Sequence, residues 1–538
     1  MNRRIAFCAG VLLLTFAGYF LFPGHTYLLS DTQIYVPMFD HLRDSTLFTR
    51  DIMALRPHLS YTIYDETALL LVRITRLSFE TVLQAEQILF RALGIAGLVL
   101  IALRILKDAW LAWCAAAIVS LGATLVGPAV LLFEYEPVPR GFAVCLLMFA
   151  MGLVAQGRDR AAGIVAGFAL LYHPPTAAPF WIVAALLIRR RTLLMPLLPA
   201  VALLLVLAKS QAGVTESPAM FRKLDWFQES LQQMRASYSF VSMWATRHFN
   251  DYAAECIVAA VAIWRLHASL TRDLRALLIG LPLIGMLCVP LSWGLLEKMH
   301  WALVPQWQPA RAVLFITLIA MLGAAVCGLR AAVERRWIEA VIWLAAAYFG
   351  PIKHAVIGRP WNWQMLELFV GFAIVTTVAV WLASRTRGVT LVAAALLPFV
   401  AIPASGLVRN YREIETPELN HVIAWARANT PVPALFLFPD AGTGLEPGIF
   451  RVRAQRALYT DWKSGGQVNY FPLFTTDWWT RWIETNAGRW NLKATDFPAL
   501  ADRSIDYVVL QAEHAVPSVP EAFRNAKYVV YATADEHK

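Results

Sequence analysis

The sequence predicts a polytopic α-helical membrane protein with about 13 transmembrane helices, followed by a small extracytoplasmic α/β domain. Of the 538 residues, 58% are hydrophobic and 16% are charged, whereas charged residues make up about 25% of soluble domains. Apolar segments long enough to cross a bilayer recur throughout residues 1–404. In residues 405–538 the charged share returns to that of a soluble domain, and helical and strand-like runs alternate.

Apolar segments define the expected spans of the membrane part. They are residues 5–22, 88–106, 110–127, 138–154, 161–171, 177–188, 193–207, 252–264, 276–293, 312–329, 337–350, 364–383 and 389–403. The first follows Arg3 and Arg4 as a signal peptide does, but its apolar run is long and no A-x-A cleavage site follows. We therefore interpret it as an uncleaved first helix.

The basic residues indicate how the chain is oriented. The net charge of +10 could suggest nucleic-acid binding, but Lys and Arg form short clusters at every second junction between apolar segments. This distribution follows the positive-inside rule and reports orientation, with no nucleic-acid partner implied. We expect a cytoplasmic N-terminus. The long loops 23–87 and 209–250 and the soluble domain 405–538 are then expected on the periplasmic side.

Two of the outer segments have predictable secondary structure. An apolar stripe in loop 209–250 predicts an amphipathic helix, which either lies on the outer membrane surface or packs against the protein's own soluble domain. The stripe comprises Met220, Leu224, Phe227, Leu231 and Met234. In the soluble domain, Thr416-Pro417-Glu418 opens a helix over 416–428. Strands are predicted at 434–438, 457–459, 507–511 and 528–532.

Two aspartates of the first outer loop are candidate catalytic residues. Asp31 lies about nine residues beyond the first apolar segment, near the expected outer interface. A carboxylate there could deprotonate a hydroxyl arriving from the aqueous side. The alternative is that Asp31 caps the helix that the following Thr-Gln-Ile-Tyr would begin. Asp51 is a possible second catalytic residue, or it caps a helix or pairs with Arg50 or Arg56.

Further charged and polar residues gather at the same outer face and are candidates for binding a lipid phosphate. They are Glu136, Arg140, His173, Gln308 and Arg311. Arg and His neutralise and hydrogen-bond phosphate, and an Arg at a helix start needs an anionic partner. All of these except Gln308 also have a structural interpretation. Glu136 and Arg140 could form an internal ion pair, His173 could be a satisfied core histidine, and Glu136 could be the partner of Arg311.

The whole chain resembles the GT-C superfamily of integral-membrane glycosyltransferases, in an uncharacterised bacterial branch. The resemblance rests on the helix count, the large first outer loop with Asp31 and the extracytoplasmic C-terminal domain. It also involves the segments 136–141, 173–174, 306–311, 450–451 and 461–463. It implies a polyprenyl-phosphate-sugar donor, a base at Asp31 with Asp51 as a possible second residue, an inverting reaction and a bacterial inner-membrane location.

The departures from the family pattern limit what it implies. The motif at Asp31 reads Ser30-Asp31-Thr32 and is neither an adjacent acidic pair nor a DxD, so no metal ligand is assigned, although a divalent metal is possible. The tail lacks a WWDYG-like motif, so transfer to asparagine is unsupported. The six cysteines lie in or beside apolar runs without a CxxC pair, which argues against a disulfide framework or zinc site.

The leading functional hypothesis is therefore a glycosyltransferase that moves a sugar from a polyprenyl-phosphate carrier to a glycan, lipid or protein acceptor at the outer face. One alternative is a transporter or flippase of lipid-linked sugar, which would be expected to show paired half-repeats and broken helices. The other is a non-catalytic envelope assembly protein whose tail binds partners. Membrane lipids are expected to surround the protein in each case.

Overall fold

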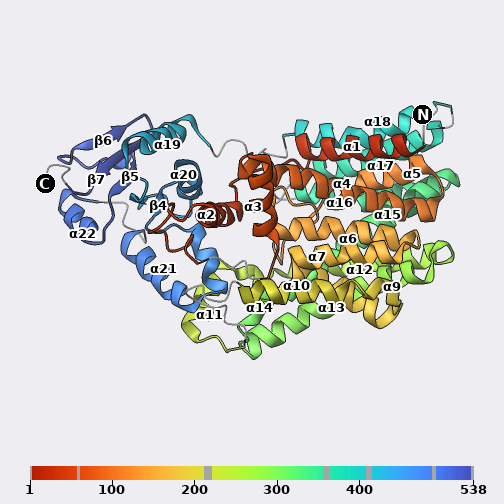
Figure 1. The fold of residues 1–538 in the computed structure, drawn as a ribbon. Helices are drawn as coiled ribbons and strands as arrows, with labels where there is room; N and C mark the ends of the chain where they lie inside the picture. Colours follow the sequence, from red (N-terminus) through yellow and green to blue (C-terminus); the bar gives the residue numbers. More distant parts are fainter. Residues whose placement is uncertain are drawn as a thin grey trace.

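A computed structural model describes residues 3–56, 61–210, 221–355, 363–383, 385–386, 388–406, 415–486 and 492–534. It consists of a long bundle of helices and a smaller domain that contains a β-sheet (Figure 1). The N-terminus lies at the end of the bundle farthest from the sheet, and the described C-terminal strand lies at the opposite end of the molecule. The chain is thus a helical membrane protein with an α/β domain at one end, as the sequence predicts.

All thirteen predicted apolar segments contain helices. The bundle comprises α1 (Arg3–Phe20), α4 (Phe79–Leu106), α5 (Ala109–Ser120), α6 (Pro139–Ala155), α7 (Asp159–Tyr172), α8 (Pro174–Val183), α9 (Arg191–Leu194), α10 (Leu197–Ser210), α12 (Thr246–Leu266), α13 (Arg272–Ser292), α15 (Leu314–Val333), α16 (Trp337–Ala355), α17 (Trp363–Ala383) and α18 (Val389–Ala404). Among the described residues, five helical stretches are long and apolar enough to cross a membrane, namely Phe79–Leu106, Arg191–Lys209, Arg272–Lys298, Leu303–Val333 and Trp363–Ala383. The count of thirteen spans therefore remains a prediction.

One predicted span ends earlier than expected. Helix α5 stops at Ser120, and the rest of segment 110–127 enters a hairpin of β1 (Thr124–Leu125) and β2 (Val130–Leu131). Gly122, at φ +79°, takes the left-handed conformation that the exit from the helix requires. The hairpin brings Pro128 to the outer end of the bundle, where it meets Arg311.

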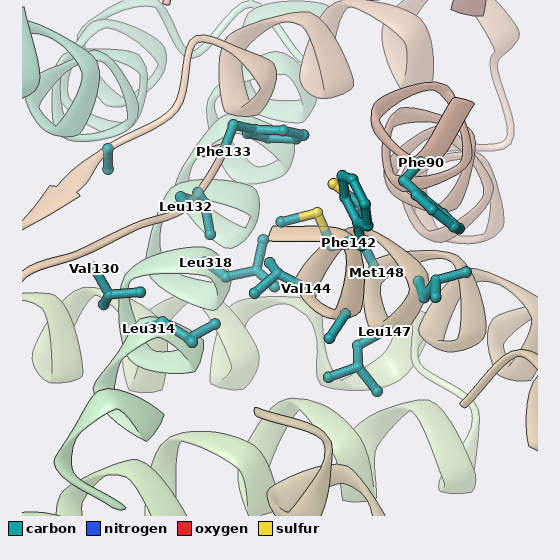
Figure 2. Packing of buried hydrophobic residues seen from close by; sticks show 14 of the residues in the cluster. Phe90, Val130, Leu132, Phe133, Phe142, Val144, Leu147, Met148, Leu314 and Leu318 are labelled. Carbon is teal, nitrogen blue, oxygen red and sulfur yellow. The ribbon is translucent and has the colours of Figure 1, made fainter. Parts of the chain in front are cut away.

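The core of the bundle lies between α4, α6 and α15. Phe90 of α4, Phe142 and Met148 of α6, and Leu318 of α15 are buried together (Figure 2). Helices α4 and α6 approach closely because Gly97 has no side chain. A Cβ on that residue would lie 2.2 Å from the backbone oxygen of Met148. Such close backbone contact through glycine is typical of helix pairs in membranes, where small residues allow tight packing.

The outer segments are folded between the bundle and the sheet. The first outer loop forms α2 (Thr32–Arg43) and α3 (Tyr64–Thr75), and the second forms α11 (Trp226–Arg235). Helix α11 packs on the C-terminal domain: Gln232 Nε2 donates to the backbone oxygen of Val468 at 3.3 Å, and the Arg235 guanidinium lies 3.9 Å from the Trp462 ring centre. Of the two expectations for this helix, the structure supports packing against the protein's own domain.

The C-terminal domain carries a five-stranded mixed sheet in the order β4-β3-β5-β7-β6. Its strands are β3 (Leu435–Leu437), β4 (Ala457–Leu458), β5 (Tyr507–Gln511), β6 (Glu521–Arg524) and β7 (Tyr528–Ala532). The first three are parallel, and β7 runs antiparallel to both β5 and β6. The helices are α19 (Pro417–Asn429), α20 (Glu446–Ala454), α21 (Pro472–Thr485) and α22 (Phe497–Asp502).

The sequence located part of this domain. Helix α19 begins as predicted, with the Thr416 side chain accepting a hydrogen bond from the Leu419 amide at 3.3 Å. Strands β3, β4, β5 and β7 lie within the predicted runs, whereas β6 was not predicted. Strand β6 is mostly exposed at the sheet edge and reads Glu-Ala-Phe-Arg, so it lacks the apolar pattern that marks a buried strand.

Candidate functional site

The predicted base Asp31 lies at the junction of the bundle, the first outer loop and the C-terminal domain. It precedes α2 but its side chain makes no capping hydrogen bond. Its Oδ2 lies 2.9 Å from Nη1 of Arg140, and its Oδ1 lies 3.0 Å from Nζ of Lys463. The Ser30 hydroxyl donates to Oδ1 at 3.2 Å. The carboxylate is therefore held by two cations, and the capping interpretation does not describe it.

These neighbours fix the charge of Asp31. Burial by itself raises the pKa of a carboxyl group, but the charges of Lys463 and Arg140 and the hydrogen bond from Lys463 outweigh it. The pKa of Asp31 is consequently held well below its ordinary value. With its side chain 26% exposed, Asp31 is an ionised group that a substrate can still approach.

Glu136 has a different role from the one expected. Its Oε1 accepts hydrogen bonds from the backbone amides of Leu29 and Ser30, both at 2.6 Å, and from the Thr32 hydroxyl at 2.9 Å. These contacts on Oε1, together with the repulsion between a carboxylate and a phosphate, argue against the predicted role of Glu136 as a phosphate ligand, which no contact here tests. Glu136 holds the 29–32 turn that presents Asp31.

Arg140 is paired with a carboxylate that the sequence analysis overlooked. Its Nε lies 2.6 Å from Oε1 of Glu134, while Nη1 contacts Asp31. The sequence offered an ion pair between Glu136 and Arg140, but in the structure Arg140 pairs with Glu134 and Asp31. Because Glu134 is buried beside the first turn of α6, it fixes the Arg140 guanidinium on the side facing Asp31.

Arg311 has no carboxylate within ion-pair distance among the residues that the structure describes. Its Nε donates to the backbone oxygen of Pro128 at 3.3 Å, and its guanidinium lies 5.1 Å from the ring centre of Tyr238. It lies in the 3₁₀ turn η6 (Pro309–Val313) that leads into α15. A mostly enclosed arginine without a paired acid provides a place for an anion from outside the chain.

His173 both caps a helix and faces the cavities near Arg311. Its Nδ1 accepts from the Thr176 amide at 3.3 Å, at the start of α8. Burial and the positive charges of Arg311 and Arg140 lower the pKa of His173 to about 3. The imidazole is therefore neutral at physiological pH. Nδ1 also lies 2.8 Å from the Thr176 hydroxyl, and in the tautomer in which Nδ1 accepts, Nε2 carries the proton and can donate a hydrogen bond.

Gln308 lies beside these two residues. It joins α14 (Leu303–Trp307) to η6 in a left-handed conformation, with φ 51°, and its backbone oxygen accepts from the Arg311 amide at 3.0 Å. It lines a small cavity together with His173 and Arg311. The structure thus brings Asp31, Arg140, His173, Gln308 and Arg311 into one region, although no contact here tests what each residue binds.

A larger cavity of about 470 Å³ adjoins this cluster. Tyr35, His173 and Tyr470 form part of its polar wall, and both tyrosines interact electrostatically with Asp31, Arg140 and Arg311. The rest of the lining is mainly apolar. Part of it comes from α10, where Val201 is 40% exposed and Leu205 is 61% exposed. The cavity therefore borders the bundle surface that would face lipid.

Asp51 lines neither of the two cavities described above, and its contacts are those of a structural residue, so they argue against the predicted catalytic role. Its side chain is 1% exposed and its Oδ2 pairs with Nε of Arg451 at 2.8 Å. It also accepts from the backbone amides of Met53, Ala54 and Leu458 at 3.0 to 3.1 Å. A fully enclosed carboxylate whose oxygens are already bonded cannot meet a substrate. Asp51 instead ties the outer loop to the C-terminal domain.

The C-terminal domain supplies site residues that the sequence analysis did not assign. Lys463 and Tyr470 come from the 3₁₀ segment η8 (Lys463–Asn469) and its end. Asp461 is paired with the buried Arg451 and accepts from the Lys463 amide at 3.1 Å, which fixes the start of that segment. Residues 461–463 are among the segments that carry the family resemblance, but only the fold shows that Lys463 reaches Asp31.

Within the described residues, no group of three or more His, Cys, Asp or Glu side chains is arranged to hold a metal ion. The acidic residues near Asp31 are instead engaged with Arg140, Lys463 and backbone amides.

Comparison with known proteins gives similarities of fold. A protein-family model described as a domain of unknown function, DUF6798, matches residues 417–485. No curated protein sequence matches the chain. Among solved structures, ArnT from Cupriavidus metallidurans in the apo state is 14% identical, with a TM-score of 0.44 over 99% of this chain and 98% of its own.

Two further structures show the same kind of similarity. The arabinofuranosyltransferase AftD from Mycobacteria is 15% identical, with a TM-score of 0.48 over 100% of this chain and 42% of its own. ArnT bound to undecaprenyl phosphate is 15% identical, with a TM-score of 0.39 over 99% of this chain and 98% of its own. The three likenesses share these low identities and TM-scores. At these identities they concern the fold, and the chemistry has to come from the side chains.

Proposed function

We propose that this protein is a membrane glycosyltransferase that takes a sugar from a polyprenyl-phosphate carrier and transfers it to a hydroxyl acceptor at the outer face. One observation carries the proposal: the ionised Asp31 and Arg311, which has no carboxylate within ion-pair distance among the described residues, share a cluster beside an apolar cavity at the bundle surface expected to face lipid. An apolar cavity with a cationic end suits a phosphate attached to a long hydrocarbon. The sugar part of the proposal comes from the GT-C resemblance of the sequence.

Different residues would bind the lipid chain and the phosphate of the donor. The polyprenyl chain would enter along α10, where the exposed Leu205 meets the cavity wall. The phosphate would lie at Arg311, with Nε2–H of His173 as a further donor. A neutral histidine donates a hydrogen bond without repelling Arg311, so the two can serve the same anion.

The reaction itself is a single displacement. The acceptor oxygen attacks the anomeric carbon while its proton moves to the Asp31 carboxylate. The bond between that carbon and the phosphate oxygen breaks, and the electron pair leaves with the polyprenyl phosphate, whose charge Arg311 stabilises. Attack from the face opposite the leaving group inverts the anomeric configuration.

The low pKa of Asp31 sets the timing of proton transfer. A carboxylate stabilised by Arg140 and Lys463 is a weak base and cannot deprotonate a free hydroxyl in advance. The proton therefore moves late, after the forming bond to the anomeric carbon has made the hydroxyl acidic. This order favours transfer to a positioned acceptor.

Native mass spectrometry of the gently purified protein tests the proposal. We expect the wild type to retain a polyprenyl phosphate or its sugar adduct, and Arg311→Ala to lose it. Arg330→Ala is the matched control, because Arg330 pairs with Glu334 at 3.0 Å near the opposite end of α15. Ordinary phospholipids alone in the wild type, together with no binding of added polyprenyl phosphate, would contradict the proposal.

A further inference from the structure

Lys463 and Arg140 both neutralise Asp31, but they are held differently. Arg140 is fixed by a second carboxylate, Glu134, at 2.6 Å. The Lys463 ammonium has Asp31 at 3.0 Å and the Ser30 hydroxyl at 2.9 Å as its hydrogen-bond partners among the described residues. The ammonium of a lysine lies at the end of a long, flexible side chain, whereas the Arg140 guanidinium is held in one orientation by two carboxylates. Lys463 is thus the cation that can leave Asp31.

The backbone of Lys463 is anchored independently of its side chain. Asp461 accepts from the Lys463 amide at 3.1 Å and is itself paired with Arg451, which is fully buried. Arg451 also pairs with Asp51 of the outer loop at 2.8 Å. The ammonium can therefore change partner while its Cα stays in place.

A suitable new partner would bind close by. Arg311, Arg140 and Lys463 all act electrostatically on Asp31, so an anion at Arg311 enters the same local field. A phosphate monoester or diester offers several acceptor oxygens to an ammonium. It also repels the Asp31 carboxylate and so weakens the existing pair.

We infer that Lys463 is a transferable phosphate ligand. In the donor-free protein its ammonium is paired with Asp31, and when the lipid donor binds, the ammonium moves to the donor phosphate. The inference rests on the proposed function and extends it to the C-terminal domain, which then supplies a substrate-binding residue to the membrane site. Once Lys463 leaves, Asp31 keeps Arg140 but loses its other cation. Its affinity for a proton rises at the moment when the donor is present.

This exchange would couple activation of the base Asp31 to binding of the donor. Asp31 becomes the better base only in the donor-loaded protein, so an acceptor that arrives first meets a neutralised carboxylate. Leaving-group stabilisation also improves, because the departing phosphate gains an ammonium in addition to Arg311. After transfer, release of the polyprenyl phosphate returns Lys463 to Asp31.

Binding of farnesyl monophosphate to the full-length protein in nanodiscs tests the exchange. We expect Lys463→Gln to weaken binding by about tenfold or more, since a charge-assisted hydrogen bond is lost. Lys463→Arg should restore most of the affinity. Lys527→Gln is the matched control, because Lys527 belongs to the same domain and lies over the Tyr528 ring, 5.3 Å from its centre.

A cryo-EM structure of the farnesyl monophosphate complex separates transfer of Lys463 from a purely long-range charge effect. The exchange is supported if Nζ lies within hydrogen-bond distance of a phosphate oxygen and no longer contacts Asp31. It is overturned, with the proposed function intact, if the wild type binds the probe while Nζ stays on Asp31 or Lys463→Gln binds as tightly. Failure of the wild type to bind the probe would overturn the proposed function and the exchange together.

Discussion

The Asp31 carboxylate and the Lys463 ammonium lie 3.0 Å apart although 432 positions separate them in the chain. One belongs to the first outer loop and the other to the C-terminal domain, so the contact exists only when both are folded against the bundle. It makes the C-terminal domain part of the candidate site.

Asp31→Asn is expected to reduce sugar transfer by at least about a hundredfold, the range of a lost general base. The fold should persist, because the Asp31 side chain caps no helix and is partly exposed. Transfer from a polyprenyl-linked donor, measured beside size-exclusion chromatography, checks both statements. Asp44→Asn is the control: Asp44 lies in the same loop and bonds only locally, to Thr46. Full activity of Asp31→Asn would remove Asp31 from the mechanism.

Asp51→Asn is expected to destabilise the protein, because it leaves the buried Arg451 with one ion-pair partner fewer. Breaking a buried charged pair costs about 3–5 kcal/mol. Arg503→Ala removes an exposed pair with Glu484 and should cost only about 0–1 kcal/mol. Thermal unfolding in detergent compares the two variants, and equal midpoints would refute the supporting role of Asp51.

Asp40 is expected to make stability depend on pH. Burial, opposed by Arg43, raises the pKa of Asp40 to about 6 from the model-compound value of 3.8. The folded state therefore binds the proton more tightly than the unfolded state. This contribution to stability is complete below the unfolded pKa and is lost as the pH rises through about 6. Asp40→Asn should flatten the fall in unfolding temperature over that interval, and an unchanged pH profile would contradict the prediction.

Gly97→Ala is expected to disturb the bundle, because the new methyl group would lie 2.2 Å from the Met148 oxygen. The resulting overpacking of α4 against α6 costs about 1–3 kcal/mol. Gly371→Ala in α17 is the control, since nothing lies within 4 Å of its added Cβ. Unfolding temperatures of the two variants in one detergent provide the comparison, with a lower midpoint expected only for Gly97→Ala.

Local patterns in the sequence were sufficient to predict the bundle helices, α11, α19 and most strands, whereas α3, α20, α21 and α22 were not predicted. Apolar runs located every bundle segment because a helix in lipid must be apolar along its length, and Thr416-Pro417 marked the start of α19 because capping is a local interaction. The pattern failed at Ser120, where the apolar run continues although the chain turns into a hairpin. Apolar character shows what is buried, and it does not show where the backbone changes direction.

Composition and periodicity alone therefore determined that this protein is a helical bundle followed by an α/β domain, since both depend on neighbours close in sequence. The tertiary structure decided which charges meet. Glu136 and Asp51 look like site residues in the sequence, yet they hold backbone amides and a buried arginine. Lys463 looks like a surface residue of the tail, yet it neutralises Asp31. Ion pairs act over a few ångströms in space, so only the folded chain decides which carboxylate remains available to a substrate.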